Sequence, residues 1–260
     1  MRLRTLAAAT AVGLVASLAP TVAAEAAAKP TYKVSISTSA TKADVGQTIK
    51  VSGKVAGPLA AKKRLAVQVR VGKGAWKTVA KVRTTKTRRY AAKVTVRTAG
   101  AQSIRVLAPK SKRAKAGASR TRGFVGWRWL DLTKQETRNE GPVTVGPVTI
   151  AGKRHATAMT FSNSGTYFNI NGACDTFKSG VGVKDGLDEN ASLLTIVATP
   201  AMGDDRETPV TAGAPVKTVR QSVSGMTMFA MGAGSGTVST VDPLVHCTVN
   251  RLPSVADILD

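Results

Sequence analysis

Aromatic residues, cysteine and histidine are all scarce in this sequence. Of its 260 residues only 4% are aromatic, two are cysteine and two are histidine. A structural zinc site is therefore poorly supported. The catalytic motifs G-x-S-x-G and H-E-x-x-H are absent, and the paired carboxylates of a glycosidase would have to come from two acidic turns. The sequence accordingly predicts a protein that is not an enzyme.

Long apolar segments are also missing beyond the N-terminus. The chain opens with Met1-Arg2-Leu3-Arg4 and an alanine-rich run to about Ala19, followed by small residues around Ala24. This layout is typical of a secretory signal peptide, which we place at 1–28. The run is shorter than the roughly 18 to 20 residues that cross a bilayer, so no transmembrane segment is expected. The prediction is a secreted, extracellular protein of bacterial type, in contact with the cell wall.

The two cysteines, Cys174 and Cys247, are the only candidates for a disulfide bond. Export makes this bond chemically accessible, and we expect the two residues to pair. The alternative is two buried free thiols. On the chain-entropy model, a closed loop of about 70 residues would stabilise the fold by roughly 4 kcal/mol.

Acidic residues are almost absent from the first half of the chain. Residues 30–125 hold 24 Lys and Arg against Asp44 alone, whereas residues 126–260 hold 11 basic and 13 acidic residues. So sharp a change predicts two domains with different surfaces.

The expected boundaries follow from this change and from the strand pattern. We place the domains at 29–122 and 123–250, with a C-terminal tail at 251–260. The basic stretch 108–123 is either a flexible connector or a basic loop and edge strand.

The basic half alternates apolar and polar residues in short runs separated by turn residues. Examples are "GQTIKVSGKV" (46–55), "RLAVQVRVG" (64–72) and "RYAAKVTVRT" (89–98). Six or seven such runs predict a small antiparallel β-sandwich. The order of these segments resembles the immunoglobulin-like modules of secreted bacterial proteins, and Trp76 is interpreted as a core residue.

The cations of this half have no acidic partners nearby in the sequence, so it should attract anionic envelope polymers. The alternative is that they only keep the domain soluble and protect its sheet edges. Sequence-specific nucleic-acid binding is not expected, because recognition-helix and base-stacking patterns are absent. The candidate polyanion-binding residues are Lys62, Lys63, Arg64, Arg88, Arg89, Lys110, Lys112, Arg113 and Lys115.

The second half carries a more specific series of segments. In order these are Trp127-Arg128-Trp129-Leu130-Asp131-Leu132, Ile150-Ala151-Gly152, His155-Ala156, "CDTFKSGVGVKD" (174–185), Gly213-Ala214-Pro215, Val223-Ser224-Gly225 and Asp242-Pro243-Leu244-Val245. Their order resembles the NPCBM family of carbohydrate-binding modules over roughly residues 126–250. The F-x-x-x-V-G-V-x-D core, from Phe177 to Asp185, is the most specific piece. The resemblance implies a jelly-roll-like β-sandwich that binds sugars, with Cys174 joined to the last strand.

The candidate carbohydrate-binding residues are His155, Trp127 and Trp129, because sugars stack on indole rings and imidazole can both donate and accept hydrogen bonds. A structural role is the alternative for His155. Val241 stands where family members commonly have a tryptophan, directly before Asp242-Pro243. This departure favours the alternative that the domain has kept the fold without the sugar site.

No cofactor is expected. Calcium is a weaker option, because the acidic turns at 185–190 and 203–207 offer oxygen ligands without the spacing of a known loop motif. Asp242 and His246 lie four residues apart in an expected strand, so their side chains point to the same face and could meet.

The sequence thus predicts an all-β protein of two tandem antiparallel β-sandwiches, immunoglobulin-like and then jelly-roll-like. Its predicted function is non-catalytic binding of a glycan or cell-wall polysaccharide, with the basic domain attaching to anionic polymers. The alternative is a polyanion-binding or structural envelope protein.

Overall fold

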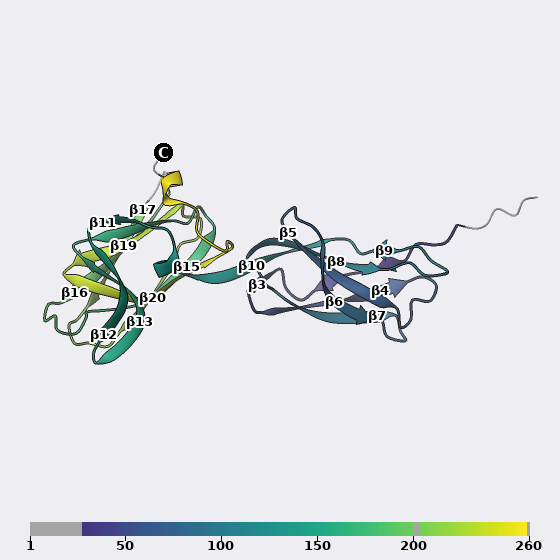
Figure 1. The fold of residues 1–260 in the computed structure, drawn as a ribbon, viewed down its shortest axis with the longest axis horizontal. Helices are drawn as coiled ribbons and strands as arrows, with labels where there is room; N and C mark the ends of the chain where they lie inside the picture. The colour runs from purple at the N-terminus through teal and green to yellow at the C-terminus, as the bar shows by residue number, and fades with distance from the viewer. Residues whose placement is uncertain (1–27, 200–202, 259–260) are drawn as a thin grey trace, which may run out of the picture.

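The structure is a computed structural model that describes residues 28–199 and 203–258 (Figure 1). The expected signal peptide lies almost wholly outside the described residues. The described chain is all-β, as the sequence predicts, with only two short 3-10 helices, η1 (Leu132–Lys134) and η2 (Val255–Ile258). Among the described residues, no helix has the length and apolarity needed to cross a membrane.

The N-terminal sandwich packs two sheets against each other. Strand β4 pairs with β1, β2 and β7 in one sheet, and the other runs β10-β8-β5-β6, with β3 beside β10 and β9 beside β8. All pairs are antiparallel except β3 with β10. The strands are β1 (Lys33–Val34), β2 (Ser37–Thr38), β3 (Lys42–Asp44), β4 (Thr48–Ala56), β5 (Arg64–Val71), β6 (Lys77–Arg83), β7 (Arg89–Thr95), β8 (Gly100–Ala108), β9 (Gly117–Ala118) and β10 (Arg122–Asp131).

The C-terminal sandwich also has two layers. Strand β20 pairs with β13, β15 and the end of β10, and β12 and β18 extend this layer. The facing sheet has the order β11-β14-β19-β16-β17. The strands are β11 (Arg138–Glu140), β12 (Val143–Ile150), β13 (Lys153–Ser162), β14 (Gly165–Asn169), β15 (Cys174–Gly182), β16 (Ala191–Ala198), β17 (Gly203–Val210), β18 (Lys217–Ser222), β19 (Met228–Ser235) and β20 (Thr237–Cys247).

One strand belongs to both sandwiches. The first half of β10 pairs with β8 from Arg122 to Gly126, and its second half pairs with β20 from Arg128 to Asp131. Figure 1 shows this strand running from one sandwich into the other. Gly126 lies at the crossover, where an added Cβ would clash with the carbonyl oxygen of Thr98. The basic stretch 108–123 is therefore not the connector, because its residues 117 and 118 pair back onto β8.

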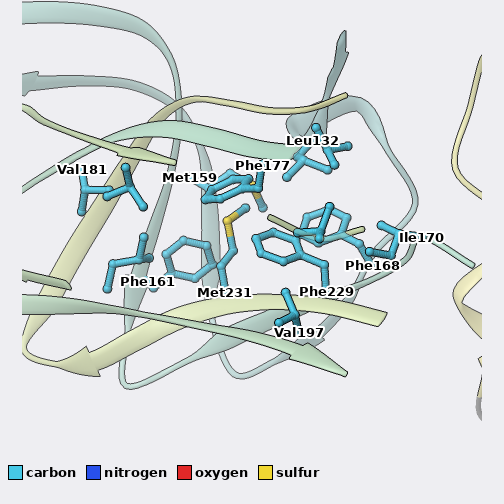
Figure 2. Packing of buried hydrophobic residues seen from close by; sticks show 14 of the residues in the cluster. Leu132, Met159, Phe161, Phe168, Ile170, Phe177, Val181, Val197, Phe229 and Met231 are labelled. Carbon is cyan, nitrogen blue, oxygen red and sulfur yellow. The ribbon is translucent and has the colours of Figure 1, made fainter. Parts of the chain in front are cut away.

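Each sandwich has its own hydrophobic core. The N-terminal core consists of aliphatic strand residues with Tyr32, Tyr90 and Phe124. Burial raises the pKa of the Tyr90 hydroxyl, which donates to the carbonyl of Ser35. The C-terminal core is built around four fully buried phenylalanines (Figure 2), which are Phe161, Phe168, Phe177 and Phe229. Burying side chains of this size contributes roughly 1.5 to 3 kcal/mol each.

The segment "CDTFKSGVGVKD" forms the centre of this second core. Phe177, Val181 and Val183 are buried, and the ring of Phe177 lies 4.6 Å from that of Phe229, centroid to centroid. The predicted disulfide is confirmed, because Cys174 and Cys247 are bonded and lie opposite each other on β15 and β20. The segment is thus a central strand that is covalently joined to its neighbour.

Candidate functional site

The predicted polyanion-binding residues gather at one end of the N-terminal sandwich. We call this the distal end: the loops at residues 57–63, 84–88 and 109–116 and the strand ends beside them. Strand β5 begins where β6 ends, since Arg64 pairs with Arg83, and β7 begins where β4 ends, since Arg89 pairs with Lys54. The loops contact one another, because the Nζ of Lys63 lies 3.4 Å from the carbonyl oxygen of Lys110. All nine predicted residues lie in these loops or at these strand ends.

A shallow groove of about 530 Å³ lies at this end. Arg64 and Arg83 stand directly opposite each other on neighbouring strands, and Lys81 lies two residues from Arg83 on the same face. Like charges in directly opposed positions destabilise a sheet. None of the ion pairs among the described residues involves these side chains. The groove therefore presents three cations whose mutual repulsion an anion would relieve.

Trp76 was interpreted from the sequence as a core residue, and this interpretation is wrong. Its ring is partly exposed on the outer face of the β5-β6-β8 layer and does not belong to the core cluster. The guanidinium carbons of Arg70 and Arg105 lie 4.8 and 4.2 Å from its ring centroid. Trp76 holds two arginines at the surface through cation–π contacts, which extends the cationic surface along the sheet.

The two tryptophans that the sequence suggests for carbohydrate binding lie where the sandwiches meet. We call this region the junction: Asp44, Trp127, Trp129, Asp175 and His246. The imidazole of His246 contacts both indole rings, with centroid distances of 4.9 Å to Trp127 and 4.8 Å to Trp129. Each indole also has a lysine over its ring, Lys42 over Trp127 and Lys178 over Trp129. A sugar could stack on either indole only by displacing one of these neighbours.

His246 also joins the two domains through its ring nitrogens. Nδ1 lies 2.9 Å from a carboxylate oxygen of Asp175, and Nε2 lies 3.1 Å from a carboxylate oxygen of Asp44. Asp44 is the only acidic residue of the basic half, and it is used here. Asp242, which shares the strand with His246, is not among its hydrogen-bond partners.

His155 lies in a separate open pocket of about 530 Å³ on the C-terminal domain. Its lining includes Lys153, Lys178, Asp242 and Leu244. Asp242 has a φ of 47°, a backbone conformation that costs energy for a non-glycine residue. Lys178, which lines this pocket, also lies over the ring of Trp129, but neither Trp127 nor Trp129 lines the pocket itself.

Only one of the two expected acidic turns is a turn. Asp185, in the turn at 185–190, accepts from the backbone N–H of Gly152. Residues 203–207 instead form the start of β17, because they pair with β16, and Glu207 accepts there from the hydroxyl of Ser192. In the sheet that contains β17, Tyr167 of β14 donates to Glu140 of β11, and this hydrogen bond raises the pKa of the tyrosine hydroxyl. Across the described residues, no three His, Cys, Asp or Glu side chains come together in a way that could hold a metal ion.

Several residues of these sites were not identified from the sequence. Asp175, Lys178 and Asp44 come from separate segments, and only strand pairing brings them to His246 and the tryptophans. The parity of β10 gives a partial signal, since Trp127 and Trp129 share one face of a strand. The arginine pair across β5 and β6 required knowledge of their register.

Comparison with known proteins adds little to this description. No protein-family model and no curated protein matches the chain. Among solved structures, the chain is similar to one from Corynebacterium diphtheriae that is described as a membrane anchored protein, with 9% identity and a TM-score of 0.31. The alignment covers 86% of this chain and 52% of the Corynebacterium diphtheriae chain, so this chain spans about half the length of that protein. A similarity of this size carries no argument about function.

Proposed function

We propose that this protein is a non-catalytic binding protein of the bacterial cell exterior that attaches to an anionic polymer through its distal end. The observation that carries this proposal is the collection of all nine candidate cations at one end of the molecule. Fixed cations without acidic partners attract polyanions strongly at low salt and more weakly as salt screens the charges. The disulfide supports an extracytoplasmic location, because such bonds persist in oxidising compartments.

The experiment compares two triple variants of the full chain that remove the same charge. In the distal variant, Lys112, Arg113 and Lys115 are replaced by Gln. In the control variant, Lys50, Lys73 and Lys184, which are also exposed but lie outside the distal end, are replaced by Gln. Binding to heparin, polygalacturonate and neutral dextran is measured over a salt series.

We expect the wild type to bind both polyanions but not dextran, and to be released by salt. The distal variant should lose roughly tenfold in affinity, which corresponds to about 1.4 kcal/mol, and the control variant much less. Equal losses in the two variants would show that only net charge matters. If the wild type bound neither heparin nor polygalacturonate, the proposal would be overturned.

A second candidate function is glycan recognition by the C-terminal domain. The supporting observation is the His155 pocket, which combines polar groups that can bind sugar hydroxyls with the apolar side chain of Leu244. Its test is a neutral glycan array probed with the full chain and with His155→Ala. Salt-resistant binding that the variant loses would support it, and no binding to neutral glycans would exclude it.

A further inference from the structure

A cleft opens on one side of the N-terminal sandwich, between β6 and β7. Its volume is about 540 Å³, within the range of ligand pockets. The floor consists of buried core residues from both sheets, Val69, Val94 and Phe124. This cleft lies near the junction, away from the distal end. It therefore exposes part of the apolar interior to a ligand that would enter from solvent.

A bulge in β6 shapes the cleft. The register between β5 and β6 shifts, so that Val67 pairs with Ala80 and Gln68 pairs with Thr78. Val79 is the extra residue, and 40% of it is exposed at the rim of the cleft. Bulges redirect side chains and end regular pairing at sheet edges. The bulge leaves an apolar side chain at the entrance.

The same shift turns a lysine toward the cleft. Lys77 pairs with Val69, whose side chain is buried in the core. Because directly opposed residues of a sheet share one face, Lys77 lies on the core side of the strand. An ammonium group thus stands at the end of an apolar floor.

Arg97 adds a second cation to the rim. It lines the cleft together with Lys77. The guanidinium of Arg70 lies instead on the outer face of the sheet, over the ring of Trp76. The only acidic residue of this half, Asp44, is at the junction.

The rim also carries exposed apolar surface. Val71 is 48% exposed, and it lines the cleft together with Val79. Exposed apolar side chains that adjoin an apolar hollow are typical of binding sites. Their position favours a ligand with an extended apolar part.

We propose that this cleft binds a single-chain anionic amphiphile, with the alkyl chain on the Val69, Val94 and Phe124 floor and the anionic head at Lys77 and Arg97. The inference goes beyond attachment to a polymer, and it uses a different surface. Both apolar burial and charge complementarity should contribute to binding. The floor is apolar and can hold an alkyl chain, and the cations of the rim have no acidic partner and can hold an anionic head.

The first experiment titrates the full chain with carboxylates of six to twelve carbons, below their micelle concentrations, by calorimetry. Each buried methylene should strengthen binding about three- to fourfold until the cleft is filled. Dodecyl maltoside has the same chain with a neutral head and should bind at least tenfold more weakly than dodecanoate. Inorganic phosphate has no chain and should not compete.

The second experiment uses two matched substitutions. Val79→Asp places a carboxylate at the rim, and Val145→Asp does the same at an exposed valine of β12, outside the cleft. Both valines are exposed, so both variants should fold, which their thermal transitions would verify. Val79→Asp should lose dodecanoate binding at least tenfold, and Val145→Asp should bind like the wild type.

Three results would overturn the proposal. These are equal dodecanoate affinity in the two variants, affinity that does not rise with chain length, and competition by inorganic phosphate. In the last two cases, the rim would be only part of the cationic surface, and the inward Lys77 would serve to keep the edge strand from pairing with another chain. Polymer binding by the distal end would be unaffected by any of these results.

Discussion

The two ends of the N-terminal sandwich differ in how their charged side chains are paired. At the distal end, Arg64 and Arg83 face each other without an acidic partner. At the junction, Asp44 meets His246, which also meets Asp175. The single carboxylate of this domain is thus placed where it joins the two sandwiches. At the distal end the cations repel one another. This arrangement stabilises the protein less than the paired charges of the junction do, and it leaves the cations available to an anionic ligand.

Hydrogen bonds to neutral acceptors also hold the junction together. The amide oxygen of Asn250, from the end of the C-terminal domain, accepts from the backbone N–H of Ala99 and lies 3.3 Å from the guanidinium of Arg128. Val45 donates its backbone N–H to the carbonyl of Trp127. Hydrogen bonds of this kind contribute roughly 0.5 to 1.5 kcal/mol each. We therefore expect domain orientation to depend on the junction, whereas the proposed polymer binding depends on the distal end.

The largest effect is expected from the disulfide, which holds the junction in register. Cys174 precedes Asp175, and Cys247 follows His246. The double variant Cys174→Ala/Cys247→Ala should lose about 2 to 5 kcal/mol of unfolding free energy. Urea unfolding of the variant and of the reduced wild type measures this loss. A loss below 1 kcal/mol in both would show that β15 and β20 do not need the bond.

A smaller loss is expected when the imidazole of the junction is removed. His246→Ala leaves Asp44 and Asp175 without their shared partner and removes the ring between the two indoles. We expect a loss of about 1 to 2 kcal/mol, limited because both carboxylates are more than a third exposed. A double-mutant cycle with Asp44→Asn isolates the link between the domains. Additive losses would show that this link contributes nothing.

An acid-dependent effect is expected at the end of β10. Partial burial raises the pKa of Asp131. Hydrogen bonds from Thr133 and Lys134 and the charge of Lys134 lower this pKa by more, so the net shift is downward. A carboxyl whose pKa is lower in the folded chain stabilises the fold above its unfolded pKa of about 4, and this contribution is lost as pH falls through the folded pKa.

Asp131→Asn should therefore cost about 0.5 to 1 kcal/mol near pH 7. The difference from the wild type should close as pH falls below about 4. Urea midpoints over a pH series measure it. A difference that is independent of pH would assign the effect to geometry and not to the charge.

The smallest effect has the opposite sign and lies at the distal end. Arg64→Gln removes one member of the opposed pair, so the fold should become more stable by about 0.2 to 0.5 kcal/mol at low salt. The gain should disappear at high salt because the repulsion is screened. The same variant should bind polyanions more weakly. Destabilisation at every salt concentration would show that the pair packs favourably and is not a strained cationic site.

The sequence alone was sufficient where a local pattern fixes the answer. Alternation of apolar and polar residues predicts strands, because side chains of an extended chain point to opposite faces. Phe177, Val181 and Val183 stand at alternating positions of one such segment, and all three are buried. The charge asymmetry is a property of composition, so it needs no structure.

The site required tertiary information because its members come from distant segments. His246 lies 202 residues from Asp44 and 71 from Asp175, and neither distance has a sequence signature. Trp76 was misassigned because the strand pattern does not reveal a partner such as Arg105, which lies on another strand. Strand register decides such contacts, and a shift of one residue reverses every side chain.

The sequence by itself determined the all-β class, the two halves of opposite charge character and the one disulfide available to the chain. Only the tertiary structure decided that β10 joins the halves as one strand and that the cations gather at the distal end. The physical reason is that hydrophobic periodicity acts within a segment. The meeting of loops and strand ends depends on pairings between segments far apart in the chain.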